Sequence, residues 1–290
     1  MSKRVLTIVN NITKNVDSTF AKRFAQINFY RITYLSDGLK VTAYLAEPKE
    51  KGTYPCIITN RGGNRNFGQW DTTSIGIHFG VMASWGYVVI GSQLRGNDGG
   101  EGKEEYGGKD VNDILNLIPV LAQIPNADTS RIGMEGLSSG GMRTFLAMKK
   151  TCRIKAAAVT GAGANLFADT GRRWEEMEKE VYFQVIPDYF KNKDSALRAR
   201  SAVSWADQMC KTTPLLMMQG SADWRTTPPE TFGLLQKLHE YRHPTRFIFF
   251  EGADHSLSEY YAQGYDERKK HFDYYVRDRK KWPGMEPHGQ

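Results

Sequence analysis

Residues 131–142 read Arg-Ile-Gly-Met-Glu-Gly-Leu-Ser-Ser-Gly-Gly-Met, and this stretch decides the fold. It is typical of a short strand, a sharp turn and the start of a helix. Within it, Gly136 to Gly140 fits Gly-x-Ser-x-Gly, the pattern of a nucleophile elbow. Glycine is expected around Ser138 because side chains there would clash with the incoming helix. The pattern predicts that Ser138 attacks a carbonyl; an ordinary Gly-rich turn is the alternative.

Two further apolar runs end in polar turns and supply partners for the serine. Residues 214–223 run through Leu-Leu-Met-Met to Asp223, and residues 246–255 run through Phe-Ile-Phe-Phe to His255. The chain order of nucleophile, acid and histidine is that of the α/β-hydrolases. Ligands of parallel sheets bind at the carboxyl ends of the strands. Ser138, Asp223 and His255 are therefore expected to meet at one site.

Each member of this triad has a competitor in the sequence. Ser139 is adjacent to Ser138, but the spacing of the glycines places Ser138 at the elbow. Asp254 lies beside His255, yet neighbours at a turn seldom face each other well enough for a triad bond. None of the remaining histidines ends an apolar strand, and these are His78, His239, His243, His271 and His288.

Composition predicts one globular domain with a modest insertion. The chain has 290 residues, of which 40% are hydrophobic and 24% charged, with a net charge of +7. A basic surface attracts nucleic acid or acidic lipid, but here the basic residues are scattered. The clusters at 268–270 and 277–281 are interpreted as the solvated face of a last helix. We therefore expect no nucleic-acid partner and no membrane partner.

Three cysteines, Cys56, Cys152 and Cys210, lie far apart and are odd in number. This pattern predicts no disulfide framework and a reducing compartment. Cys56 lies in an apolar run and is expected in the core. The N-terminal apolar run is too short for a signal peptide, and no stretch approaches a membrane span. A cytoplasmic location is the resulting expectation.

Strands that alternate with helices after an antiparallel start predict a mostly parallel central sheet with helices on both faces. A hairpin is expected around residues 36–38. The chain is divided into an N-terminal extension at 1–26, which could be helical, and a catalytic domain at 27–290. Other strands are expected at 55–60, 87–90 and 155–160, and helices at 75–85, 110–122 with a kink at Pro119, and 230–241.

Residues 163–209 interrupt the alternation, since they contain no convincing strand and are rich in charged and aromatic residues. We interpret them as a helical insertion that partly caps the site. Trp174, Tyr182 and Phe183 are candidates for lining an acyl or side-chain pocket. The alternative is that they simply pack the insertion onto the domain.

Together these segments resemble the catalytic domain of the prolyl oligopeptidase family of serine hydrolases, whose relatives include dipeptidyl-peptidases and acylaminoacyl-peptidases. The resemblance covers about residues 37–276. It implies an α/β-hydrolase fold, a serine peptidase activity and no cofactor. The matching motifs are the Gly-x-Ser-x-Gly-Gly elbow at 136–141, the acid loop at 220–228, the Gly-x-x-His turn at 252–255 and the Arg-Gly loop at 93–96 with 107–110.

The chain departs from the family pattern at two loops. Asn60-Arg-Gly-Gly63 stands where many relatives have His-Gly-Gly, or a tyrosine that helps to bind the oxyanion, and Arg61 occupies that position. The acid loop has Thr226 and Thr227 where valine and proline are usual, and Pro228 comes one residue late. The β-propeller of the large oligopeptidases does not fit in this length.

The oxyanion of such an enzyme is expected on backbone N–H groups, from Ser139 and from Arg61 or Gly62. The Arg61 and Arg95 side chains could contact a substrate carboxylate or carbonyl, or pair with an acid and support a loop. Loop support is favoured for Arg95, and both interpretations stay open for Arg61.

Other ligands fit the sequence poorly. The Gly-rich loop at 96–102 lacks phosphate-loop spacing, because Glu104 follows Lys103 where serine or threonine is required. No set of His, Cys and Asp residues has metal-ligand spacing, so no metal is predicted.

Three functions remain: a peptidase acting on short or unstructured peptides, a carboxylesterase acting on small esters, and a non-catalytic binding module. A homo-oligomer is left open.

Overall fold

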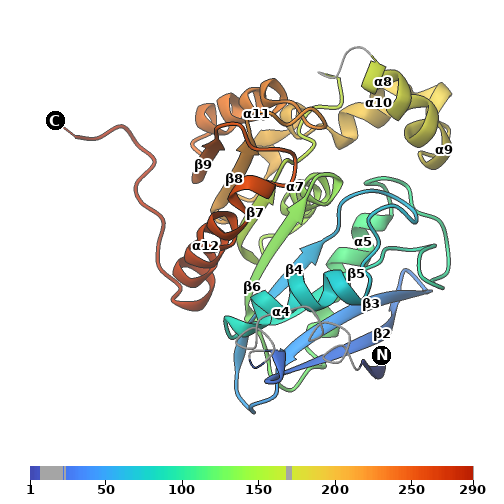
Figure 1. The fold of residues 1–290 in the computed structure, drawn as a ribbon. Helices are drawn as coiled ribbons and strands as arrows, with labels where there is room; N and C mark the ends of the chain where they lie inside the picture. Colours follow the sequence, from blue (N-terminus) through green and yellow to red (C-terminus); the bar gives the residue numbers. More distant parts are fainter. Residues whose placement is uncertain (7–21, 23, 168–171, 290) are drawn as a thin grey trace.

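The computed structural model describes residues 1–6, 22, 24–167 and 172–289, and a nine-stranded sheet forms its centre (Figure 1). The strand order is β1-β2-β3-β5-β4-β6-β7-β8-β9. From β5 to β9 the neighbouring strands are parallel, whereas β1, β2 and β3 pair antiparallel. The strands are β1 (Ser2–Leu6), β2 (Ile27–Ser36), β3 (Leu39–Pro48), β4 (Tyr54–Asn60), β5 (Val88–Ser92), β6 (Ala127–Leu137), β7 (Ile154–Thr160), β8 (Leu215–Gly220) and β9 (Thr245–Phe250).

The hairpin predicted near residues 36–38 joins β2 to β3. Ser36 pairs with Leu39, which leaves Asp37 and Gly38 as a two-residue turn with φ of 50° and 81°. Turns with positive φ at both positions match the right-handed twist of the strands, and aspartate followed by glycine favours them. This turn sets the register of the antiparallel half of the sheet.

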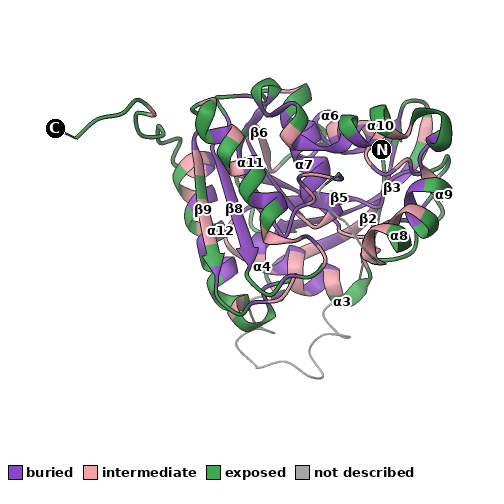
Figure 2. Cartoon of the chain, turned by 90° about the horizontal axis from the view of Figure 1, so that it is seen from above, coloured by how far each residue is buried: buried purple, intermediate pink, exposed green. Residues whose placement is uncertain are grey.

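Helices cover both faces of the sheet, as predicted, and buried residues concentrate on the central strands (Figure 2). Successive residues of β7 point to opposite faces: Ala156 and Ala158 pack in one apolar cluster, and Ala157 and Val159 pack in another. The first cluster includes residues of η1 (Ile75–Phe79), α4 (Gly80–Ser84), α12 (Tyr261–Phe272) and η6 (Asp273–Arg277). Of these, η1 and η6 are π-helical turns. The short helix α3 (Thr72–Ser74) precedes η1. The second includes residues of α5 (Asp110–Leu115), α7 (Ser139–Lys150) and α11 (Pro228–Glu240).

The helix expected at 110–122 is divided at Asn116, into α5 and α6 (Leu117–Leu121). Pro119 lies in the first turn of α6. A proline has no N–H to donate to the carbonyl four residues earlier, and its ring crowds that carbonyl. The affected carbonyl belongs to Leu115, the last residue of α5, so the break lies where the proline predicts it.

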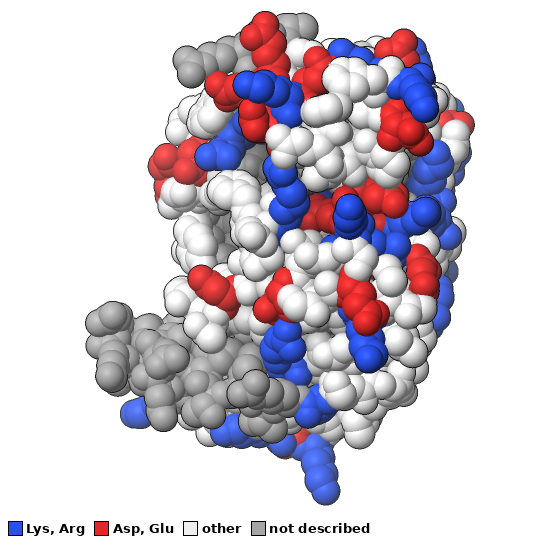
Figure 3. Space-filling model, turned by 90° about the vertical axis from the view of Figure 1, so that its right-hand side faces the viewer, with Lys and Arg blue, Asp and Glu red and all other residues white. Residues whose placement is uncertain are grey.

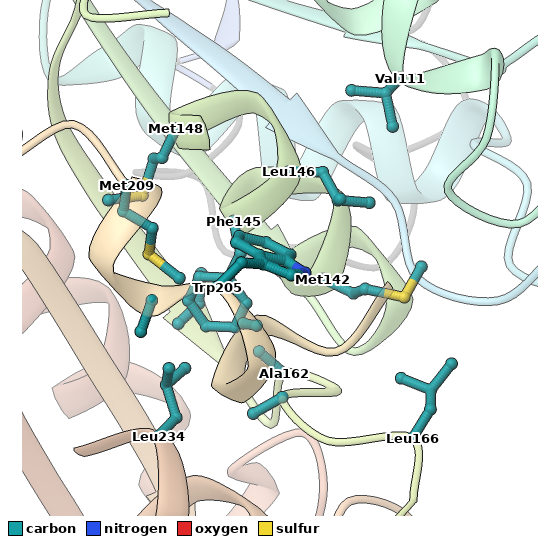
Figure 4. Close-up of a cluster of buried hydrophobic side chains, with 14 of the residues drawn as sticks. Val111, Met142, Phe145, Leu146, Met148, Ala162, Leu166, Trp205, Met209 and Leu234 are labelled. Atoms are coloured by element: carbon teal, nitrogen blue, oxygen red, sulfur yellow. The ribbon is translucent and has the colours of Figure 1, made fainter. Parts of the chain in front are cut away.

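The described residues of the insertion are helical and contain no strand. Figure 1 shows α8 (Arg172–Met177), α9 (Phe183–Val185) and α10 (Tyr189–Arg200) grouped at one end of the molecule. Trp205, near the end of the insertion, packs with Phe145 of α7 in the apolar cluster of Figure 4. The remaining short helices are η2 (Glu178–Tyr182), η3 (Ala202–Ser204), η4 (Ala206–Gln208) and, after β9, η5 (Ser258–Tyr260).

Two sequence predictions need correction. Ser2–Leu6 form a strand that pairs antiparallel with β2, so a helical extension is wrong for these residues. Residues 7–21 and 23 lie outside the described part of the chain. Cys152 and Cys210 form a disulfide, with 5.4 Å between their Cα atoms, although the odd number of cysteines predicted none. The predicted cytoplasmic location loses that support.

The structure also describes the remaining cysteine, the lengths of the helices and the charge on one face of the surface. Cys56 is a free, buried cysteine on β4, as predicted. Across the part of the chain that is described, no helix is both long and apolar enough to cross a membrane. On the face shown in Figure 3, Lys and Arg are interspersed with Asp and Glu, and no single basic patch dominates this face.

Candidate active site

Ser138 lies between the end of β6 and the start of α7, with φ of 58° and ψ of −123°. Such a conformation is rare for a residue with a side chain and persists only where the surroundings enforce it. The Ser138 N–H donates to the Thr160 carbonyl of β7 at 2.9 Å, which ties the turn to the neighbouring strand. The turn therefore has the geometry expected of a nucleophile elbow.

The three glycines around Ser138 are required by close backbone contacts. A Cβ on Gly136 would lie 2.3 Å from the carbonyl oxygen of Gly140. A Cβ on Gly140 would lie 2.1 Å from the carbonyl oxygen of Asn60, and one on Gly141 would lie 2.4 Å from the Cβ of Ala162. No side chain fits at these separations, so the helix approaches the strands only because these residues are glycine.

Asp223 and His255 form a hydrogen-bonded pair, with 2.8 Å between Asp223 Oδ2 and His255 Nδ1. Four other donors point at the same buried carboxylate: the N–H of Arg225 at 2.8 Å, the N–H and hydroxyl of Thr226 at 3.1 and 2.7 Å, and Gln219 Nε2 at 3.0 Å. Burial raises the pKa of Asp223, but the hydrogen bonds from His255 and Thr226 outweigh it, so the pKa lies below its ordinary value. The acid is thus ionised and fixed in orientation.

The departures in the acid loop have a structural explanation. The Thr226 hydroxyl bonds the acid directly, a contact that valine could not make. Thr227 begins α11 with a capping box that includes Glu230, and Pro228 occupies the first turn, where a missing N–H costs nothing. Sequence reasoning missed Gln219 as a partner of Asp223; its signal is a single polar residue at the end of an apolar strand.

Ser138 lies where two cavities meet. One cavity, of about 640 Å³, is lined by Ser138 and His255 together with residues of η1 and α12; we call it the histidine-side cavity. The other, of about 520 Å³, is lined by Ser138 and Ser139 together with Met177 and Val181 of the insertion; we call it the insertion-side cavity. Ser138 and His255 thus line one cavity, and Asp223 is connected to it through its hydrogen bond with His255.

The residues predicted for an oxyanion site lie beside the nucleophile. Ser139 is the first residue of α7, where backbone N–H groups are unpaired within the helix and favour negative charge. A Cβ on Gly62 would lie 3.4 Å from the Cβ of Ser138, which places the Gly62 backbone against the nucleophile. The Ser139 hydroxyl donates to the Gly63 carbonyl at 2.6 Å and so ties this loop to α7.

The Arg61 side chain does not reach the cleft, so its prediction as a substrate contact is wrong. Its side chain is 0% exposed and pairs with Glu104, with 3.2 Å between Arg61 Nη2 and Glu104 Oε2. Its guanidinium also donates to the carbonyls of Gln93, Arg65 and Phe67. Burial lowers the pKa of Arg61 to about 10, and the side chain stays charged at neutral pH. Arg61 therefore positions its loop.

Arg95 supports a loop, as predicted. It pairs with buried Asp113 at 2.7 Å and with Asp37 at 2.8 Å. Sequence reasoning missed a second buried arginine, Arg143 of α7, which pairs with Asp110 at 2.8 Å and with Glu104. Glu104 lies in the Gly-rich segment after β5, and Asp110 and Asp113 lie in α5, the helix that follows. Their ion pairs with arginine hold this segment in place.

The aromatic candidates of the insertion pack its interior. The Tyr182 ring is buried, with its centroid 5.7 Å from that of Trp174. Phe183 is half exposed, and its ring centroid lies 4.6 Å from that of Phe190. None of the three lines either cavity beside Ser138, so the structure favours the packing alternative over a substrate contact. Their neighbours Met177 and Val181 line the insertion-side cavity instead.

Sequence reasoning also missed a polar group in the histidine-side cavity. Glu135, the residue before Gly136, is buried and accepts from His78 Nε2 at 2.8 Å. His78 Nδ1 lies 2.5 Å from the Tyr265 hydroxyl, and Arg268 Nε lies 3.8 Å from Glu135 Oε2. Burial raises the pKa of Glu135, but the charge and hydrogen bond of His78 outweigh it, and the net shift is downward. The only signal in the sequence is a glutamate inside an apolar strand.

Metal ligation finds no support in this cleft. Among the described residues, no group of three or more His, Cys, Asp or Glu side chains is arranged to hold a metal ion. The chemistry available is that of a serine, a histidine and a fixed carboxylate.

Comparison with known proteins identifies the family. The profile described as the prolyl oligopeptidase family matches residues 73–281. The chain belongs to this family. It is a serine-type peptidase with an α/β-hydrolase fold.

Two peptidases of Bacillus subtilis (strain 168) are similar to this chain over most of its length. The uncharacterized peptidase YtmA is 30% identical over 230 residues, which are 79% of this chain and 86% of YtmA. The uncharacterized peptidase YuxL is 29% identical over 238 residues, 77% of this chain but only 34% of YuxL. A solved acylaminoacyl peptidase from Pyrococcus horikoshii has a TM-score of 0.75 at 20% identity, covering 94% of this chain and 45% of its own. The chain therefore spans less than half of these larger relatives.

Proposed function

We propose that the chain hydrolyses peptide bonds of short or unstructured peptides through a covalent acyl-enzyme. Ser138 Oγ attacks the scissile carbonyl carbon while His255 Nε2 takes the hydroxyl proton. Asp223 accepts the Nδ1–H of His255, which fixes the tautomer and stabilises the imidazolium. The observation that carries the proposal is the 2.8 Å Asp223–His255 pair in one cleft with a serine of elbow geometry.

The negative charge that develops on the carbonyl oxygen would be bound by backbone N–H groups of Ser139 and of Arg61 or Gly62. When the intermediate collapses, the amine leaves with the proton of His255. A water molecule then attacks the acyl carbonyl while His255 takes its proton. Ser138 regains a proton from His255 and the carboxylic acid product is released. Loss of one oxyanion donor typically costs about 100-fold to 1,000-fold in rate.

The insertion supplies one wall of the cleft, since Met177 and Val181 line the insertion-side cavity together with Ser138. We propose that it acts as a partial cap over the acyl side of the substrate. Hydrogen bonds between the insertion and the loop after β4, residues 61–68, which we call the oxyanion loop, support this. Arg65 of that loop donates to Gln184 Oε1 at 2.5 Å and to the Glu180 carbonyl at 2.7 Å.

The test is turnover of a p-nitroanilide and an ester that share one acyl group. We expect the wild-type protein to cleave both and Ser138→Ala to cleave neither. Ser195→Ala is the matched control, because it removes an exposed hydroxyl on α10, away from the cleft. Cleavage of the ester alone would favour a carboxylesterase. Failure of a fluorophosphonate to label Ser138 in the folded protein would favour a binding module.

A further inference from the structure

The insertion-side cavity is lined by three arginines, Arg65, Arg173 and Arg225, and by no aspartate or glutamate. These arginines come from three separate segments: the oxyanion loop, α8 of the insertion and the acid loop. The cavity contains Ser138 and Ser139, so any group bound in it lies beside the reacting carbonyl.

The position of His255 distinguishes the two sides of the cleft. His255 must protonate the leaving group, and it lines only the histidine-side cavity. The leaving group therefore belongs to that cavity. The acyl part of the substrate, which stays bonded to Ser138, extends into the insertion-side cavity. There it meets Arg65 and Arg173, and also Arg225, which lines both cavities.

The Arg65 guanidinium and the Nε of Arg173 donate hydrogen bonds to neutral groups. The Arg65 guanidinium donates to Asn64 Oδ1 at 3.0 Å in addition to its two contacts with the insertion. Arg173 Nε donates to the Arg225 carbonyl at 2.6 Å. Within the described ranges, neither Arg65 nor Arg225 forms an ion pair with a carboxylate. Both guanidiniums keep their positive charge available to a ligand.

Arg173 and Arg225 also share one aromatic partner. Their Cζ atoms lie 5.4 and 5.0 Å from the centroid of the Trp224 ring, a distance typical of cation–π contacts. An anion bound beside this ring would be attracted by both guanidiniums. The backbone N–H of Arg225 is fixed on Asp223, so the position of this charge is tied to the triad.

Resting on the peptidase function proposed above, we propose that the insertion-side cavity selects an acidic residue, aspartate or glutamate, on the acyl side of the scissile bond. Guanidinium groups bind carboxylates through charge-assisted hydrogen bonds. Removal of the charge from the substrate side chain should lower kcat/KM by about 10-fold to 100-fold, the range for hydrogen bonds to charged groups.

The test compares two p-nitroanilides, acetyl-Ala-Ala-Glu and acetyl-Ala-Ala-Gln, which differ only in one side-chain charge. We expect a Glu-to-Gln ratio of kcat/KM of at least about 10 at low salt, decreasing as salt screens the pair. Arg173→Met and Arg225→Met should each lower that ratio toward one. Arg153 is an exposed arginine immediately before β7; Arg153→Met removes the same charge elsewhere and should leave the ratio unchanged.

The outcomes separate this proposal from the one on which it rests. Cleavage that depends on Ser138 but does not discriminate Glu from Gln would overturn the acidic preference and leave the peptidase intact. A preference that survives both arginine variants would also overturn it, since the cavity would not be its cause. No cleavage of either anilide, with no fluorophosphonate labelling of Ser138, would overturn the proposed function itself.

Discussion

Glu104 is the carboxylate on which the loops around the elbow converge. Its Oε2 accepts from Arg61 Nη2 at 3.2 Å, from the Arg65 N–H at 2.8 Å and from Asn97 Nδ2 at 3.0 Å. Its Oε1 accepts from Arg143 Nη2. Glu104→Gln keeps the size of the side chain, removes its charge and replaces one acceptor oxygen with an NH2 donor, so the variant breaks the ion pairs and one group of these hydrogen bonds.

The expected cost follows from the burial of the cluster. The side chains of Arg61 and Arg143 are 0% exposed, and that of Glu104 is 2% exposed. In the variant Arg143 would keep its ion pair with the buried Asp110, whereas Arg61 would lose its carboxylate partner. Breaking a buried ion pair from one side costs about 3–5 kcal/mol. We expect the free energy of unfolding to fall by that amount.

Urea unfolding at pH 7, followed by tryptophan fluorescence, measures this change. The control is Glu105→Gln, the adjacent residue, whose side chain is 19% exposed and lies 4.0 Å from the exposed Lys109. A surface pair of this kind contributes about 1 kcal/mol or less. Equal losses for Glu104→Gln and Glu105→Gln would refute the reasoning, because they would show that burial does not determine the cost.

Three further variants test other parts of the structure. Gly140→Ala places a Cβ 2.1 Å from the Asn60 carbonyl oxygen, so kcat/KM on the anilide should fall about 100-fold or more. The control Gly163→Ala, whose Cβ would lie 4.0 Å from its nearest neighbour, should retain activity. Equal kcat/KM values for the two variants would contradict the packing argument. Gly233→Ala in the exposed interior of α11 should raise stability by roughly 0.5–1 kcal/mol, seen as a higher Tm; an unchanged Tm would count against it. Burial lowers the pKa of His271 from 6.5 to about 4, so the unfolded chain binds the proton first and stability is lost as pH falls from 6.5 to 4. His271→Gln should reduce the loss between pH 7 and 4.5 by roughly 2–3 kcal/mol in urea titrations, and a loss equal to that of the wild type would exclude this role.

The elements of the cleft that could be predicted from sequence are those specified by local patterns. The elbow requires glycines within three residues of Ser138, and the strands before Asp223 and His255 are continuous apolar runs. Each pattern involves a short segment, and the order of the segments along a parallel sheet brings their ends together. Local chemistry and sheet topology were sufficient for these residues.

The features that were missed depend on partners far apart in the chain. Arg61 is buried because Glu104, 43 residues later, folds onto it, and no local pattern connects the two. The same holds for the cavity arginines, which come from three segments. The first strand was missed because Ser2–Leu6 has too few residues for a periodicity to stand out. The role of the aromatic residues of the insertion stayed open because buried and ligand-lining aromatics look alike in sequence.

The Cys152–Cys210 disulfide has a consequence for the integrity of the molecule. It closes a loop of 58 residues that contains β7 and the whole insertion. A protease that cut the backbone anywhere within this loop would leave two fragments joined through sulfur. Such a nicked protein would migrate as one species on a non-reducing gel and as two after reduction. The arginines Arg65 and Arg225 lie outside the loop and Arg173 within it, so a single cut would leave all three on one covalently connected molecule.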